Sequence, residues 1–93
     1  MTRDELATAV RQAIGATIPE ADPASLNPAS PIRDQLDMDS MDFINFVIEL
    51  DKALHLAVPE ADYGQLTSID SCVEYLEGMQ AGQGGRRDLP AGA

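Results

Sequence analysis

The sequence predicts a small all-α domain with three main helices, a short helical turn before the last of them, and a long loop between the first two. Three segments repeat apolar residues at helical spacing, and no alternating pattern longer than a few residues indicates a strand. A chain of 93 residues provides for one small domain at most. We expect residues 1–80 to form that domain and residues 81–93 to form a flexible Gly-rich tail.

The first helix is expected to begin after Thr2 and to end before Pro19. Thr2 and Glu5 fit a capping box, in which each side chain bonds the other residue's backbone N–H. Pro19 ends the helix because its ring fixes φ and leaves no N–H to donate. One stripe of this helix should be buried, and it consists of Leu6, Val10, Ala13, Ile14 and Thr17.

Residues 19–39 are expected to form the long loop. Four of the six prolines fall there, together with other residues typical of turns. A loop of about twenty residues inside a compact domain usually has a function. Three apolar side chains should anchor it to the core: Leu26, Ile32 and Leu36.

The second main helix should run from about Ser40 to Leu54. Asp39 is placed to act as its N-cap, and a carboxylate at Asp42 is favoured by the helix dipole. These two acids therefore fix the start of the helix at Ser40. Its core face consists of Phe43, Phe46, Val47, Leu50 and Leu54.

A second apolar stripe on the same helix consists of Met41, Ile44 and Ile48. It lies well off the core face, and one apolar face is enough for a surface helix. The second stripe therefore needs another contact within the domain or a partner protein.

The remaining elements are a helical turn from Asp62 to Leu66 and a last helix. Thr67 or Ser68 should cap this helix, and Gly78 is the expected end. Its buried stripe should consist of Ile69, Cys72, Val73 and Leu76.

The charge of the chain excludes several classes of partner. Sixteen acids against six Lys plus Arg give a formal net charge of -10, so no basic face is available for nucleic acid or for an anionic membrane. No apolar run is long enough to span a bilayer, the N-terminal residues lack the apolar stretch of a signal peptide, and one cysteine cannot form an internal disulfide. We expect a cytoplasmic protein whose partners are basic.

No pattern in the sequence predicts catalysis. The single histidine, His55, lies fifteen residues from Ser40 along one helix, about 22 Å at 1.5 Å per residue, so the two cannot form a dyad. Cys72 falls on an apolar face and is interpreted as a core residue. The acids at positions 34–42 lack the Gly and Glu that an EF-hand requires, and we expect no metal site.

Ser40 is the candidate for chemistry carried out by another protein. It follows a long loop and opens an amphipathic helix, so an anion attached there would meet a favourable dipole and free backbone N–H groups. The dipeptide Asp-Ser also occurs at Asp70-Ser71, but there it lies in the first turn of the last helix and is interpreted as capping.

At this point the sequence resembles the acyl carrier protein family over roughly residues 2–80. The resemblance implies a small four-helix bundle of the acyl-carrier type, with three main helices and a short third one, and a non-catalytic, freestanding, monomeric carrier. The segments that carry the resemblance are Leu36-Asp37-Met38-Asp39-Ser40-Met41-Asp42, Val58-Pro59-Glu60 and Thr67-Ser68-Ile69.

The resemblance also implies a covalent cofactor on Ser40. A phosphopantetheinyl transferase would transfer 4′-phosphopantetheine from coenzyme A to Ser40, and the terminal thiol would hold acyl groups as thioesters. In the family the acyl chain can fold back between the helices. Enzymes with basic docking surfaces would load and remove the acyl group. By position, the partner-binding residues would be Asp39, Met41, Asp42, Ile44, Ile48, Asp51 and Glu60.

Three positions depart from the housekeeping fatty-acid carrier. Asn45 and Lys52 stand where acids are usual, and Asp37 replaces a common Gly. We interpret the chain as a specialised carrier for a lipid, fatty-acid or polyketide-type pathway. The alternatives are a non-catalytic acidic helical module that binds a basic partner, and a peptidyl or aminoacyl carrier.

Overall fold

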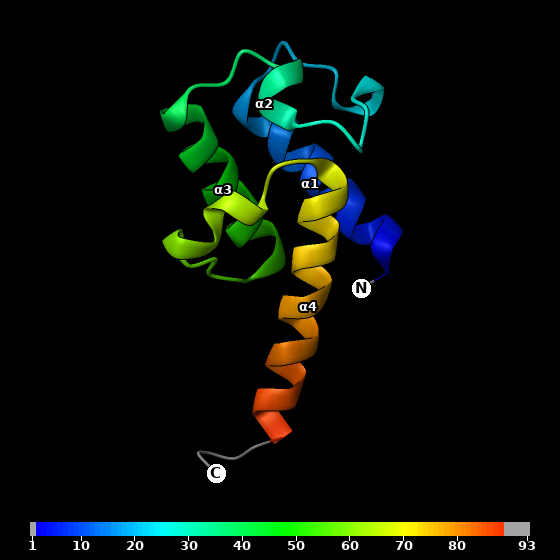
Figure 1. Ribbon diagram of the computed structural model, residues 1–93, viewed down its shortest axis with the longest axis vertical. Helices are drawn as coiled ribbons and strands as arrows, with labels where there is room; N and C mark the ends of the chain where they lie inside the picture. The colour runs from blue at the N-terminus through cyan, green and yellow to red at the C-terminus, as the bar shows by residue number, and fades with distance from the viewer. Residues whose placement is uncertain (1, 89–93) are drawn as a thin grey trace.

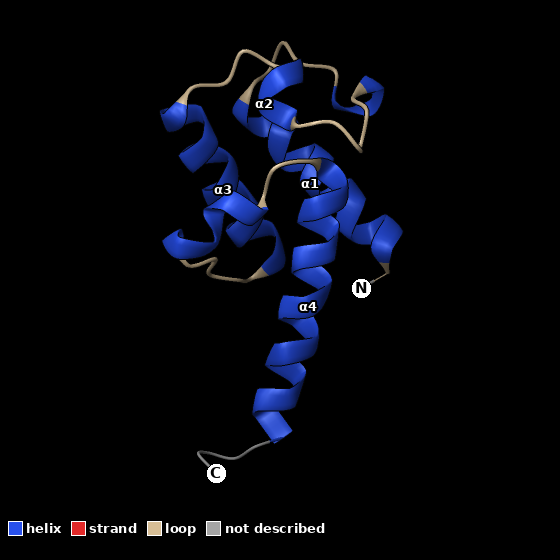
Figure 2. Ribbon diagram, viewed as in Figure 1, coloured by secondary structure: helices blue, strands red, loops and turns tan. Residues whose placement is uncertain are grey.

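A computed structural model of the chain describes residues 2–88, with the side chains of residues 2–80. All regular elements of this part are helical, which confirms the all-α class (Figure 2). In chain order they are α1 (Arg3–Thr17), η1 (Pro23–Ser25), α2 (Ile32–Gln35), α3 (Ser40–Leu54), η2 (Glu60–Gln65) and α4 (Ile69–Asp88). The short element η2 is the helical turn expected between the last two main helices.

Helices α1, α3 and α4 enclose one apolar core (Figure 1). Each helix contributes the stripe that the sequence predicts, and α1 buries four of its five predicted positions while Thr17 is half-buried. On α3, Phe43 is half-buried and the other four predicted positions are buried. The core side chains with no exposed surface at all are Leu6, Val10, Ile14, Phe46, Val47, Leu50, Cys72 and Leu76.

The long loop contains two short helices that the sequence did not predict. Both η1 and α2 lie at one end of the bundle (Figure 1). The side chain of Gln35 closes this segment: Nε2 donates to the Asn27 carbonyl oxygen at 2.9 Å, and Oε1 accepts from the Asn27 N–H at 2.7 Å. The guanidinium of Arg11, on α1, donates to the carbonyl oxygens of Pro23 and Leu26. The loop is therefore held to the bundle by polar contacts as well as by its apolar anchors.

The loop also bonds the start of α4. The Ile32 N–H donates to the Thr67 carbonyl oxygen at 2.8 Å, and the Asp70 N–H donates to the Pro28 carbonyl oxygen at 2.9 Å. Of the three predicted anchors, Leu26 and Ile32 are buried and Leu36 is half-buried. The loop thus reaches Ser40 from a fixed position on the bundle.

The end of the last helix differs from the prediction. Helix α4 continues through Gly78 to Asp88, so the stop expected at Gly78 is wrong. Gly78 does not take the left-handed backbone that ends a helix, and a glycine inside a helix costs only about 1 kcal/mol. The division between a domain at 1–80 and a flexible tail at 81–93 stays a prediction, and residues 89–93 lie outside the described residues.

His55 ends α3 with a left-handed backbone, at φ 56° and ψ 46°. This is the one positive φ at a non-glycine among the described residues. The side chain of Asp51 supports the turn that follows, because its Oδ1 accepts the Val58 N–H at 3.2 Å. A residue with a Cβ in this conformation costs free energy that glycine does not.

The His55→Gly variant should therefore be more stable than the native chain, by about 0.5–1 kcal/mol after the added freedom of the unfolded chain is counted. Urea unfolding followed by circular dichroism would measure the difference. His55→Ala is the matched control, because it removes the imidazole but keeps the Cβ, and it should give no such gain. Equal effects of the two variants would contradict this account of the turn.

Candidate functional site

Ser40 is the first residue of α3, and its neighbours cap the helix in its place. Asp39 Oδ1 accepts the Asp42 N–H at 2.8 Å, and Asp42 Oδ2 accepts the Asp39 N–H at 3.4 Å. These bonds form a complete capping box. Ser40 is exposed, and within residues 2–80 its hydroxyl makes no hydrogen bond. The hydroxyl is thus free for chemistry at a helix start that the two carboxylates already stabilise.

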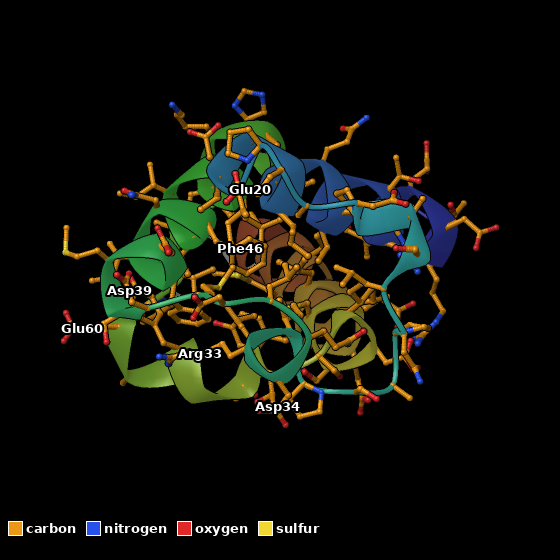
Figure 3. The ribbon with its side chains drawn as sticks, turned by 90° about the horizontal axis from the view of Figure 1, so that it is seen from above. Glu20, Arg33, Asp34, Asp39, Phe46 and Glu60 are labelled. Atoms are coloured by element: carbon orange, nitrogen blue, oxygen red, sulfur yellow. The ribbon has the colours of Figure 1, made fainter. Side chains whose placement is uncertain are left out.

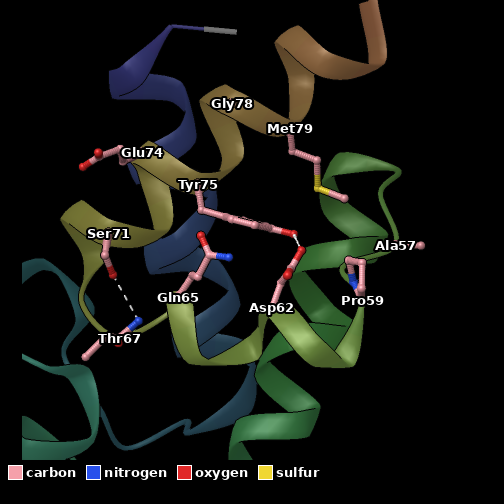
Figure 4. A pocket seen from close by; sticks show the side chains of 10 residues that line it. All are labelled: Ala57, Pro59, Asp62, Gln65, Thr67, Ser71, Glu74, Tyr75, Gly78 and Met79. Carbon is pink, nitrogen blue, oxygen red and sulfur yellow. Dashed lines mark hydrogen bonds between the residues drawn. The ribbon is translucent and has the colours of Figure 1, made fainter. Parts of the chain in front are cut away.

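The second Asp-Ser dipeptide is used differently. Ser71 Oγ accepts the backbone N–H groups of Thr67 and Ser68 at 3.0 and 2.8 Å, and the Ser71 N–H donates to Ser68 Oγ at 3.0 Å. Figure 4 shows the first of these bonds. Ser71 is half-buried and its oxygen is occupied. The capping role predicted for this serine is confirmed, with Ser68 as the N-cap.

A pocket of about 380 Å³ opens beside Ser40, between the loop, α3 and η2. Aromatic rings form one wall: Phe43 and Tyr63 meet edge to face with their centroids 5.9 Å apart, and Phe46 lies 6.0 Å from Phe43 on the core side. The pocket is lined by Pro31, Arg33, Ser40, Phe43, Ile44, Tyr63, Gly64, Leu66 and Thr67. A group attached to Ser40 therefore has an apolar cavity at its base.

Arg33 stands over this wall from α2. Its guanidinium carbon lies 5.8 Å from the centroid of the Phe43 ring, a cation–π contact. Figure 3 shows Arg33 reaching toward the start of α3, where Asp39 is labelled. Sequence reasoning missed both Arg33 and the pocket, because Phe43 and Tyr63 belong to different elements and their contact has no local signal.

The outer stripe of α3 remains uncovered. Met41, Ile44 and Ile48 are 64%, 39% and 45% exposed, and they are the large hydrophobic side chains that the described part of the chain leaves exposed. No element of the described residues covers them. The sequence allowed either a contact within the domain or a contact with a partner protein. Since no described element makes the first contact, we expect the second.

The acids predicted to bind partners occupy different environments. Asp39 and Glu60 are exposed and lie on the same side of the molecule (Figure 3). Asp42 is half-buried in the capping box. Asp51 is half-buried, and desolvation raises its pKa, while the Val58 N–H that it accepts opposes that shift. The structure thus gives Asp51 a role in the turn after α3, and its part in docking stays a prediction.

Other reactive groups are not arranged for catalysis in the described part of the chain. Burial raises the pKa of the Cys72 thiol to about 12, so its reactive thiolate is absent at neutral pH. His55 lies at the opposite end of α3 from Ser40. Among residues 2–80, no three His, Cys, Asp or Glu side chains lie close enough to hold a metal ion. No helix in the same part combines the length and apolar character needed to cross a bilayer.

A larger pocket, of about 880 Å³, lies between η2 and α4 (Figure 4). The Tyr75 hydroxyl donates to Asp62 Oδ2 at 2.7 Å across it, and burial together with that carboxylate raises the pKa of Tyr75 to about 12. Ser40 does not line this pocket. The smaller pocket, which Ser40 lines, is therefore the one associated with the candidate serine.

Comparison with known proteins gives a family match over most of the chain. The family described as a phosphopantetheine attachment site matches residues 4–76. An acyl carrier protein of Rubrobacter xylanophilus is 26% identical over 76 residues, which are 82% of this chain and 93% of that protein.

Two mitochondrial relatives are longer than the matched region. A mitochondrial acyl carrier protein of Neurospora crassa is 24% identical over 76 residues, 82% of this chain and 57% of that protein. A putative mitochondrial acyl carrier protein of Schizosaccharomyces pombe is 26% identical over 55 residues, 59% of this chain and 49% of that protein. The chain thus matches about half of each of these two proteins.

Two substitutions on α3 test which of its two apolar stripes is packed in the core. Leu50 has no exposed surface, so Leu50→Ala should lower the free energy of unfolding by about 2–5 kcal/mol. Ile48 is 45% exposed, so Ile48→Ala should lower it by about 0.5 kcal/mol or less. Chemical unfolding of both variants measures the contrast. Similar losses in the two would show that Ile48 belongs to the core.

Proposed function

The chain belongs to the acyl carrier protein family that contains the phosphopantetheine attachment site, and from this premise we propose that Ser40 is the residue to which the arm is attached. Members of this family are carriers and not catalysts, and they hold 4′-phosphopantetheine covalently. When bound, this group supplies a thiol that holds an acyl chain as a thioester. The single observation that carries the assignment is the exposed Ser40 hydroxyl, which makes no hydrogen bond within residues 2–80.

The residues around Ser40 fit the group. The phosphate would stand at the N-terminus of a fifteen-residue helix, where the dipole favours an anion. The Asp39 carboxylate already accepts the Asp42 N–H, so the Ser40 hydroxyl is not needed as a cap. The pocket beside Ser40 is lined by apolar side chains that can shelter an acyl chain from water, among them Ile44 and Leu66.

We expect loading to require a partner enzyme, because the single histidine of the chain lies at the far end of α3 and the carboxylates of Asp39 and Asp42 are engaged in the capping box. Ser40 Oγ would attack the phosphorus next to the pantetheine of coenzyme A, and the bond from that phosphorus to 3′,5′-ADP would break. The hydroxyl proton would go to a base of the transferase, since His55 is fifteen residues away on the same helix, about 22 Å. Ser40 is thus the substrate of a phosphopantetheinyl transferase.

The docking surface that we propose combines the outer stripe with acids. Its core is Met41, Ile44 and Ile48, which the domain leaves exposed. The acids around this apolar centre would steer a basic partner and set its orientation. The residues of the proposed surface are Asp39, Met41, Asp42, Ile44, Ile48, Asp51 and Glu60.

Lys52 makes this surface different from a uniformly acidic one. Its ammonium pairs with Glu49 at 3.1 Å, so the charge of Glu49 is compensated within α3. Asn45, one turn before Glu49, is exposed and carries no charge. We propose that the carrier serves a dedicated partner set in a lipid, fatty-acid or polyketide-type pathway. The expected cytoplasmic location and monomeric state stay predictions.

Loading can be tested directly. The purified apo protein should gain the mass of one phosphopantetheine when it is incubated with coenzyme A and a broad-specificity transferase. Ser40→Ala should gain none, and intact-protein mass spectrometry measures both. Ser71→Ala is the matched control, since it removes the serine of the other Asp-Ser dipeptide, and it should still be modified. An unmodified native chain would favour the interaction module, and an adduct on Ser40→Ala would move the site elsewhere.

The charge at Lys52 gives a second test. Lys52→Glu should raise kcat/KM for transferase loading by about threefold at low salt, because exposed charge pairs are worth about 0.2–1 kcal/mol. The gain should disappear near 1 M salt, where the screening length is about 3 Å. Arg3→Glu changes the net charge by the same amount on α1 and should give no gain. An equal effect of both variants would exclude a local role for Lys52.

A further inference from the structure

The pocket beside Ser40 contains one cation. Among its nine lining residues, Arg33 is the one with a charged side chain. Arg33 is exposed, and within residues 2–80 its guanidinium makes no ion pair. Its guanidinium instead lies against the Phe43 ring. A cation that contacts only a ring is available to an anion from elsewhere.

The Arg33 guanidinium and Ser40 line the same pocket. Ser40 and Phe43 are three residues apart on α3, so they share a face, with Cβ atoms about 5–6 Å apart. The Arg33 guanidinium carbon is 5.8 Å from the Phe43 ring centroid, and both residues line the same pocket as Ser40. An anion bonded to Ser40 Oγ would therefore stand at the edge of the pocket that Arg33 also lines.

The other charges around Ser40 make such an anion unfavourable without Arg33. The ionisable neighbours along the chain on both sides are acids: Asp37, Asp39 and Asp42. A phosphodiester on Ser40 would add one more negative charge to this group, and like charges at this separation repel. Arg33 offers the opposing charge on the side of the pocket.

We propose that Arg33 is a positioning residue that binds the phosphodiester on Ser40 and thereby directs the attached arm along the pocket. The inference rests on the proposed function of Ser40. A guanidinium presents its N–H donors at its edge and binds phosphate oxygens through two parallel bonds, while its face can stay on an aromatic ring. The contact with Phe43 thus holds the guanidinium in place and leaves its donors free.

The consequence is a preferred course for the arm. With its phosphodiester bound from the α2 side, the arm begins toward Phe43, Ile44 and Tyr63 instead of away from the protein. The phosphodiester is favoured over a carboxylate on the cargo, because it is bonded to Ser40 itself whereas the cargo is at the far end of the arm. Arg33 would act before any cargo is present.

The test compares apo and phosphopantetheinylated protein by NMR. We expect loading of the native chain to shift the signals of the Ile44 methyl groups and the Tyr63 ring, and to place the phosphorus-31 signal in an Arg33-dependent position. Arg33→Gln should lose more than half of each change. Arg33→Lys keeps the charge but not the planar fork, so it should retain an intermediate part. About 1 M salt should weaken the changes in the native chain, because it screens an exposed contact.

Arg3→Gln is the matched control, because Arg3 is an exposed arginine of α1 that pairs with Glu77. It should keep the full changes. Arg33→Gln that loads normally but keeps the full changes would overturn the proposal and leave the proposed function of Ser40 intact. Arg33-dependent changes that appear only when the thiol carries a succinyl group, and not in the free-thiol form, would also overturn it, since the cargo would then be the ligand. Failure of the native chain to load is instead a failure of the proposed function, and mass spectrometry detects it separately.

Discussion

The backbone bonds between the long loop and the start of α4 set the geometry on which the site depends. The first N–H groups of a helix have no partner within the helix and need acceptors from outside. The Pro28 carbonyl oxygen accepts one of them, from Asp70, and the Ile32 N–H bonds the Thr67 carbonyl oxygen in return. The loop and the helix end thus satisfy each other's polar groups. Since the chain continues from this point through α2 to Ser40, the same bonds fix where α3 begins and where the pocket opens.

The two Asp-Ser dipeptides show how capping decides which serine is free. At α3, the Asp39 carboxylate accepts the Asp42 N–H and the Asp42 carboxylate accepts the Asp39 N–H, so the Ser40 hydroxyl has no capping role. At α4, the hydroxyls of Ser68 and Ser71 do the capping. A side chain that satisfies a buried or half-buried N–H is costly to remove from that role. Where carboxylates cap the helix, as at α3, the serine stays available to a partner enzyme. Where serine hydroxyls cap it, as at α4, the serine is needed for the fold.

Local signals explain what the sequence could predict. The caps at Thr2 and Asp39 and the apolar stripes depend on residues within one or two turns, so the helix starts and core faces were predicted. Helix α2 depends on bonds from Gln35 to Asn27 and on the bond from the Ile32 N–H to the Thr67 carbonyl oxygen, and no local pattern predicts them. The end of α4 predicted at Gly78 was wrong, because a glycine ends a helix only where its backbone takes the left-handed conformation. The pocket also escaped prediction, because its wall joins rings from α3 and η2.

The positions of the basic residues connect the fold to the proposed mechanism. In the described side chains, Arg3 and Lys52 pair with acids, and Arg11 bonds loop carbonyl oxygens. These three cations are used by the chain itself, whereas Arg33 contacts only a ring beside Ser40. The acids of α3 are thus available to a basic partner. Arg33, the cation that remains available to an anion, lies on the side of the pocket. A basic partner docked on α3, as we propose, would bring its own cations toward Ser40, and these could replace the contact proposed for Arg33.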